Sequence, residues 1–358
     1  MTISFDNKHI IFDNIPGQFI DNIDNYLQNY TKVTIKNCLN FVNFTCLPNY
    51  THLCISNCPK LTNIFETSNC THINIVECPE LINLTELLQC KKLFIINCPK
   101  LDGIFSKLPN CTELYLDNCG VTNINNLVKC RDLSIKNCHN LVSLPTELLY
   151  CTYLNINCNY LLSYIPTNLP NCIIFNVDFC NNLMHIQSEL PKCKEFTISN
   201  CQKLNTISSK LPSCTQFEIS LCNNLTIIPN TLPNCIKLLI MSCQLCDKIP
   251  QTLPSCVNLG LLNCYLLNKI PNELPNCEYI NIDNCFELTR TPNELLKCKK
   301  ITITNCHQLT NLPFDLPNCE YLNIQNCSEL LNIPETINQY MVNCHKIKKK
   351  CGDSYVLI

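Results

Sequence analysis

Cysteine is the residue whose number and spacing in this chain are most suggestive of chemistry, because thiolates bind zinc and carry out redox reactions. The chain has 33 cysteines among 358 residues, and most of them fall into two regular series. The first series, with steps of 19 to 22 residues, consists of Cys38, Cys58, Cys78, Cys98, Cys119, Cys138, Cys158, Cys180, Cys201, Cys222, Cys243, Cys264, Cys285, Cys306 and Cys327. The second series, eight residues earlier in most units, consists of Cys70, Cys90, Cys111, Cys130, Cys151, Cys172, Cys193, Cys214, Cys235, Cys256, Cys277, Cys298 and Cys319.

The spacing of these cysteines favours a structural role over a metal or redox site. Zinc needs four ligands that converge on one point, whereas one cysteine per strand gives a line of thiols about 4.8 Å apart. Cys243 and Cys246 have the C-x-x-C spacing, but Cys246 takes a position that is leucine in most units. Disulfides between neighbouring units would have poor geometry. We therefore expect free thiols in a reducing compartment, each a small apolar group whose S–H reaches a free carbonyl; a zinc or redox protein is the lesser alternative.

The cysteines belong to a repeating unit that explains their positions. Read from the first cysteine, the unit is C-x-x-L-x-I-x-N-C-x-x-L-x-x-I-P-x-x-L-P-N, as in the near-identical segments LPNCEYINIDNC and LPNCEYLNIQNC. Positions 4 and 6 are apolar in all fifteen copies, and this alternation predicts a short strand with an apolar inner face. A fixed period of about 20 residues predicts an array whose identical strands stack in parallel.

The second half of the unit predicts a return segment without a helix. Pro250 and Pro254, like Pro271 and Pro275, stand four residues apart, and each proline removes a backbone donor. We expect an extended, polyproline-like return on the convex side, held inward by apolar residues at positions 12, 15 and 19.

Asparagine precedes the cysteine of the first series in eleven of fifteen units. Asparagine amides often bond the backbone of a turn locally, and we expect that bond here. The exceptions are Glu77, Phe179, Leu221 and Ser242.

The unit resembles the leucine-rich repeat signature L-x-x-L-x-L-x-x-N/C-x-L, as carried by CEYLNIQNCSEL from Cys319 to Leu330. The resemblance covers roughly residues 30 to 336 and implies a solenoid of about 15 repeats of 20–22 residues, with a curved parallel sheet on the concave side. The placement of cysteine at position 9 resembles the repeats of ubiquitin-ligase adaptors. The segment IPxxLP is similar to the repeats of bacterial effector proteins. Departures are the cysteine at position 1 and the absence of a helical convex segment. The amino-acid composition is typical of a protein encoded by an AT-rich genome. Taken together with the repeats, it makes the chain resemble repeat proteins of mimivirus-like giant DNA viruses of amoebae.

The two ends of the chain differ from the array. Residues 1–29 combine a possible hairpin, TISFDNKHIIF, with the helical pattern of GQFIDNIDNYL, and we expect them to cap the first repeat. An F-box in this segment is the functional alternative. Residues 30–336 form the predicted leucine-rich repeat array, and residues 337–358 a C-terminal cap with the basic tail CHKIKKKC.

Composition argues against several classes of function. The formal net charge is −2, from 26 basic and 28 acidic residues, so there is no excess of positive charge for nucleic acid or an anionic membrane. No apolar stretch reaches the roughly 18 residues of a membrane-spanning helix, and no signal peptide is evident. Five glycines leave little material for a phosphate-binding loop, and no known catalytic spacing occurs. We predict a cytoplasmic, non-enzymatic protein without a cofactor.

Function is therefore expected on positions 3, 5 and 7, the outward side of the strands. These positions are mostly polar, but two apolar patches interrupt them, and such patches often mark protein interfaces. The alternative is that terminal segments or a second copy of the chain cover the patches. His52 and His72 share position 3 on adjacent strands and can pair on the same face. The first patch consists of Val76, Phe94, Ile96 and Tyr115, and the second of Leu239, Met241, Gly260, Leu262 and Tyr279.

These observations predict a non-catalytic scaffold that binds protein partners on its concave face, with the resemblance suggesting a viral factor that engages host proteins in the host cytoplasm. The alternative is a substrate adaptor of a ubiquitin ligase.

Overall fold

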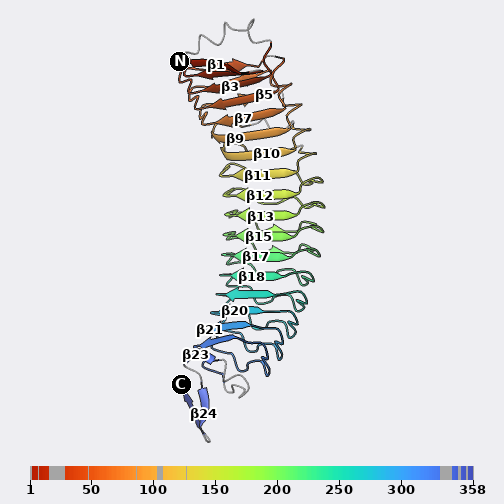
Figure 1. The fold of residues 1–358 in the computed structure, drawn as a ribbon, viewed down its shortest axis with the longest axis vertical. Helices are drawn as coiled ribbons and strands as arrows, with labels where there is room; N and C mark the ends of the chain where they lie inside the picture. The colour runs from red at the N-terminus through yellow and green to blue at the C-terminus, as the bar shows by residue number, and fades with distance from the viewer. Residues whose placement is uncertain are drawn as a thin grey trace. The chain divides into compact units, whose positions relative to one another are not determined.

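A computed structural model describes residues 2–6, 8–15, 29–46, 48–85, 87–102, 108–125 and 127–330, and the backbone of 341–345, 348–351 and 354–357 (Figure 1). The chain forms two compact units, Met1–Pro170 and Asn171–Ile358. In each unit, short strands pair in parallel with the strand of the next repeat, so that like positions of successive repeats lie side by side.

The first unit begins with an antiparallel hairpin, which confirms the hairpin expected near the N-terminus. Its second strand then pairs in parallel with the first strand of the array. The strands, in order across the sheet, are β1 (Thr2–Asp6), β2 (His9–Asp13), β3 (Lys32–Lys36), β5 (His52–Ser56), β7 (His72–Val76), β9 (Lys92–Cys98), β10 (Glu113–Cys119), β11 (Asp132–Lys136) and β12 (Tyr153–Asn157). The helix expected in GQFIDNIDNYL lies outside the described residues.

The second unit continues the same pattern and ends in a short antiparallel hairpin. Its parallel strands are β13 (Ile174–Asp178), β15 (Glu195–Ser199), β17 (Gln216–Ser220), β18 (Lys237–Met241), β19 (Asn258–Leu262), β20 (Tyr279–Asp283), β21 (Lys300–Thr304), β22 (Tyr321–Gln325) and β23 (Met341–His345). The hairpin consists of β24 (Lys348–Cys351) and β25 (Ser354–Leu357).

The return segments contain no helix among the described residues, as the paired prolines predicted. Some of them add narrow parallel pairings of their own. In the first unit these are β4 (Asn43–Thr45), β6 (Asn63–Phe65) and β8 (Asn83–Leu84), and in the second β14 (His185–Ile186) and β16 (Thr206–Ile207). The parallel sheet and the non-helical return confirm the predicted fold class, a leucine-rich repeat solenoid.

The core of each unit is built from rows of identical positions. Positions 4 and 6 of the parallel strands from β3 to β22 point inward and are buried, as are the apolar residues at position 12 on the return side. In the second unit, Phe175, Phe196 and Phe217 stack with ring centroids 5.0 and 5.2 Å apart and planes within 4°. Such stacked rings add to the roughly 1.5–3 kcal/mol that burial of each large side chain contributes.

Position 8 explains why asparagine recurs in the unit. In every repeat this residue has a positive φ, between 50° and 57°, a conformation that asparagine tolerates better than most residues. The expected local backbone bond is wrong, because the amide reaches the neighbouring repeat instead. Asn57 donates from Nδ2 to Oδ1 of Asn37 at 2.9 Å, and Asn326 donates to Oδ1 of Asn305 at 2.8 Å.

Residues 158 and 159 correct the first cysteine series. Cys158 has a φ of 54° and is partly exposed, so it occupies position 8. Asn159 is fully buried at position 9, where the other repeats place cysteine. The step is therefore 21 residues on either side, and ten repeats rather than eleven have asparagine at position 8. The two residue types have exchanged places in this repeat.

Ile240 is fully buried at position 6 of β18, and we expect Ile240→Asp to unfold several repeats together. A carboxylate without a partner in the core costs more than about 4 kcal/mol, and each repeat depends on its neighbours. Urea unfolding followed by circular dichroism measures the loss. Met241→Asp, on the outward side of the same strand, is the control and should be tolerated; a native-like spectrum of Ile240→Asp would contradict the register.

Asn159 bonds three backbone groups, and its replacement should show how position 9 is satisfied. It accepts from the Cys138 N–H at 3.1 Å and donates to the carbonyls of Ile135 and Asn157 at 3.0 and 2.9 Å. Asn159→Ala should lower the free energy of unfolding by about 2–4 kcal/mol, because the buried Cys138 N–H loses its acceptor. Asn159→Cys should cost clearly less, since a thiol serves elsewhere in the row. Equal losses for the two variants, measured by urea unfolding, would refute this account.

Candidate functional site

The cysteine rows are structural, as their spacing predicted. At position 9 the thiol donates to the carbonyl two residues earlier, as Cys38 does to Lys36 at 3.3 Å. At position 1 it donates to the carbonyl two residues later, as Cys90 does to Lys92 at 3.4 Å. None of the 31 cysteines whose side chains the structure describes forms a disulfide, and all but Cys54 and Cys158 are buried. The S–H groups thus add a hydrogen bond to the carbonyls at positions 3 and 7, where the chain enters and leaves each strand.

Burial also makes many of these thiols less reactive. Burial raises the pKa of the Cys98 thiol to about 11 and that of Cys111 to about 12. In the C-x-x-C pair, Cys246 donates to the Lys248 carbonyl at 3.3 Å, and burial raises its pKa to about 11. Because the thiolate is the nucleophile and the metal ligand, protonated thiols of this kind do neither job at neutral pH. No group of three or more His, Cys, Asp and Glu residues suited to a metal ion occurs in the described ranges.

The structure brings the first predicted patch together on the outward side of β7, β9 and β10. Phe94 lies opposite Tyr115 in the register, and their rings stack with centroids 5.9 Å apart. Val76 lies opposite Ile96 in the same way. The Lys136 ammonium sits 5.5 Å from the centre of the Tyr115 ring, so a cation borders the patch.

The second predicted patch surrounds a hollow of about 400 Å³ on β18, β19 and β20. Gly260 opens this hollow: a Cβ there would lie 2.6 Å from Cδ1 of Leu239, so Leu239 leans across the glycine. Tyr279 lines the other side and is 43% exposed. Met241 and Leu262 pair with each other beside the hollow, at position 7.

The first unit also contains a basic row that sequence analysis recognised only in part. His52 and His72 stack with ring centroids 4.4 Å apart and planes within 5°, which confirms their predicted pairing. At position 3 of the flanking strands stand His9, Lys32 and Lys92, and the row borders a hollow of about 310 Å³. His9 was missed because it precedes the first recognised repeat; the shared position 3 was the signal for the others.

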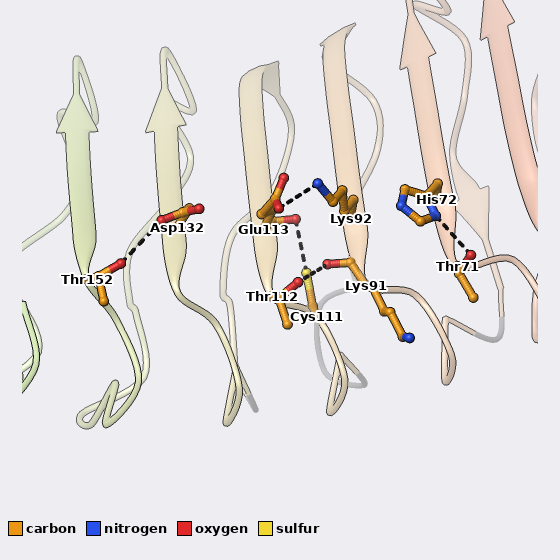
Figure 2. Close-up of polar contacts among 9 residues, drawn as sticks. All are labelled: Thr71, His72, Lys91, Lys92, Cys111, Thr112, Glu113, Asp132 and Thr152. Atoms are coloured by element: carbon orange, nitrogen blue, oxygen red, sulfur yellow. Dashed lines mark hydrogen bonds and ion pairs between the residues drawn. The ribbon is translucent and has the colours of Figure 1, made fainter.

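Polar contacts between strands hold the side chains near this row (Figure 2). The Lys92 ammonium pairs with the Glu113 carboxylate at 2.7 Å across β9 and β10. The threonines at position 2 donate to the backbone of the preceding repeat, as Thr112 does to the Lys91 carbonyl at 3.0 Å. Thr71 also contacts Nδ1 of His72 at 2.9 Å. The contacts therefore fix both the spacing of the strands and the orientation of the outward side chains.

A row of aromatic residues at position 10 was not foreseen. His139 stacks on Tyr160 at 4.8 Å in the first unit. In the second, Phe286 stacks on Tyr265 at 4.9 Å and on His307 at 5.4 Å. These rings lie where the chain leaves the strand, away from the two predicted patches.

Comparison with known proteins assigns no family to this chain. No protein-family model matches the chain, and no curated protein matches it either. A crystal structure of a leucine-rich repeat protein from Bacteroides ovatus ATCC 8483 is similar, at 15% identity and a TM-score of 0.27, over 87% of this chain and 84% of that one. Nothing in the described part of the chain forms a helix long and apolar enough to cross a membrane.

The raised thiol pKa values predict a sharp loss of stability in alkaline solution. In the folded protein Cys98 stays protonated to about pH 11, whereas in the unfolded chain it ionises near its ordinary value of 9.0. The unfolded state therefore binds fewer protons above pH 9, and each such thiol lowers the free energy of unfolding by about 1.4 kcal/mol per pH unit until its folded pKa is reached. Urea unfolding between pH 8 and 11 under reducing conditions tests this. Cys98→Ala should have a shallower slope than wild type, and an unchanged slope would contradict the assignment.

Proposed function

We propose that the protein is a non-catalytic scaffold that binds protein partners on the outward face of its strands. The observation that carries this proposal is the pair of apolar patches on an otherwise polar sheet face. The Phe94 ring is 36% exposed although it stacks on Tyr115, and Tyr279 is 43% exposed beside the hollow at Gly260. Exposed aromatic side chains on rigid elements are typical anchors of protein interfaces.

The state of the cysteines supports a binding role over a chemical one. Thiols are the most abundant reactive groups of this chain, but they are buried and bonded to backbone carbonyls. The raised pKa values of thiols such as Cys98 and Cys111 keep them protonated, so they serve the architecture of the repeats.

Two finer roles are compatible with the scaffold: a viral factor that engages host proteins, and a substrate adaptor of a ubiquitin ligase. The adaptor role needs a docking segment within residues 1–29. There, β1 and β2 pair with each other, and β2 continues the sheet at β3. This part of the segment acts as the edge of the sheet, which favours the simpler scaffold role.

Replacing an anchor of either patch by a charge should release the partner that uses it. We expect Phe94→Glu or Leu239→Glu to weaken at least one interaction by about 2 kcal/mol or more. The reason is that the substitution removes an apolar anchor that becomes buried when the partner binds. Affinity purification from eukaryotic host cells with quantitative mass spectrometry gives the readout, and circular dichroism confirms folding. Ile227→Glu is the matched control, since Ile227 is 53% exposed on a return segment. Partner sets that neither patch variant alters would contradict the proposal.

A further inference from the structure

The basic row of the first unit is continuous across five neighbouring strands. The register pairs His9 with Lys32, Lys32 with His52, His52 with His72, and His72 with Lys92. Strands lie about 4.8 Å apart, so the row is about 19 Å long. It is bounded beyond Lys92 by acidic residues at the same position, Glu113 and Asp132.

Lys32 carries a positive charge in this row that no ion pair among the described residues neutralises. The Lys92 ammonium is paired with Glu113 at 2.7 Å, and Lys36 on the same face is paired with Asp13 at 3.3 Å. Lys32 is exposed and makes no ion pair with any residue that the structure describes. Its ammonium group, between two histidines, is available to an external anion.

The hydrogen bonds of the histidine pair indicate which ring nitrogen faces a ligand. The Thr51 hydroxyl donates to the Thr31 carbonyl at 3.2 Å, and the Thr71 hydroxyl donates to the Thr51 carbonyl at 3.1 Å. Each hydroxyl has a single hydrogen, so the 2.9 Å contacts to His52 and His72 are donated by the Nδ1–H groups. This leaves Nε2 of both rings as the atom that takes up a proton and then donates to an anion.

The surroundings disfavour the protonated form of both imidazoles. Burial lowers the pKa of His52, and the adjacent His72 and Lys32 lower it further. Burial likewise lowers the pKa of His72, with Lys92, Lys91 and Lys32 acting in the same direction and Glu113 opposing them. A bound negative charge offsets both effects, so binding and proton uptake are coupled.

The hollow beside the row has the size and lining for an acidic side chain next to an apolar one. It measures about 310 Å³, and Thr34, Cys54 and Asn74 lie along it at position 5. Phe94 closes the hollow at one end and belongs to the first apolar patch. The basic row and the patch therefore form one continuous surface.

We propose that this surface binds an extended acidic segment of a partner protein, with carboxylates held by Lys32 and the His52–His72 pair and an apolar side chain packed on Phe94 and Tyr115. The inference rests on the proposed scaffold function and specifies its partner. Glu113 and Asp132 limit the basic row to a short stretch, which disfavours a long polyanion such as nucleic acid. The parallel histidine rings, within 5° of each other, do not converge on one point, which disfavours a metal ion.

The test measures fluorescence anisotropy of labelled peptides with the full chain. The probe is an octapeptide that alternates glutamate and leucine, and the reference replaces each glutamate by glutamine. We expect the glutamate peptide to bind about tenfold more tightly, and Lys32→Gln to remove most of that difference. Lys210→Gln, an exposed lysine of the second unit, is the charge-matched control and should change nothing.

Proton coupling supplies a second readout. From pH 7.5 to pH 5.5 the affinity for the glutamate peptide should rise about three- to tenfold, because the imidazoles become protonated while the glutamates stay ionised. The double variant His52→Asn with His72→Asn should lose this rise, whereas His185→Asn, on a return segment, should keep it. Circular dichroism checks that each variant is folded.

Equal binding of the two peptides, or unchanged binding by Lys32→Gln, would overturn the inference. Competition by a fifteen-residue oligothymidine as effective as by the glutamate peptide would also overturn it, in favour of a general polyanion surface. If the peptides fail while cellular partners still depend on Phe94 or Leu239, only the acidic-segment assignment falls and the scaffold function stands.

Discussion

Parallel pairing of strands in strict register is the constraint on which the rest of this structure depends. Each side chain lies about 4.8 Å from the residue at the same position of the next repeat. The molecule is therefore organised in rows, and the contacts of a side chain depend on the residues at the same position of the adjacent repeats. The same register stacks Phe175 on Phe196 in the core and Phe94 on Tyr115 on the surface.

Inward rows are governed by the need to satisfy backbone groups at the turns. The carbonyls at positions 3 and 7 lie where the chain enters and leaves each strand, and polar groups at such places need hydrogen-bond partners. The position 7 carbonyl accepts the N–H of position 8 in the preceding repeat, as Ser56 does from Asn37, and a thiol adds a second hydrogen bond. A thiol is small, apolar and able to donate weakly, so it meets the requirement without disturbing the packing. Asn159 meets it differently, with an amide that bonds three backbone groups. Position 9 thus requires a small side chain that can form hydrogen bonds, and it does not require a reactive thiol.

Outward rows carry no such requirement, and function is free to vary there. Their side chains stand on strands whose spacing is fixed by backbone and threonine hydrogen bonds, so little conformational freedom is lost when a partner binds. In the first unit, the stacked pair His52 and His72 leads into the exposed ring of Phe94. In the second, Gly260 opens a hollow between Leu239 and Tyr279. Charge and shape therefore differ between the two surfaces although the backbone pattern is the same.

The order of residues alone was enough to derive the repeat, its strands, their inward positions and the helix-free return, because alternation and proline placement are local properties. It misplaced Cys158, since Asn and Cys had exchanged positions; the positive φ of Cys158 and the burial of Asn159 show the correct register. Which outward groups meet, and that Lys32 stays without an ion pair while Lys92 pairs with Glu113, required the tertiary structure. These partners lie about 20 residues apart, and strand register and side-chain orientation bring them together, neither of which a local pattern encodes.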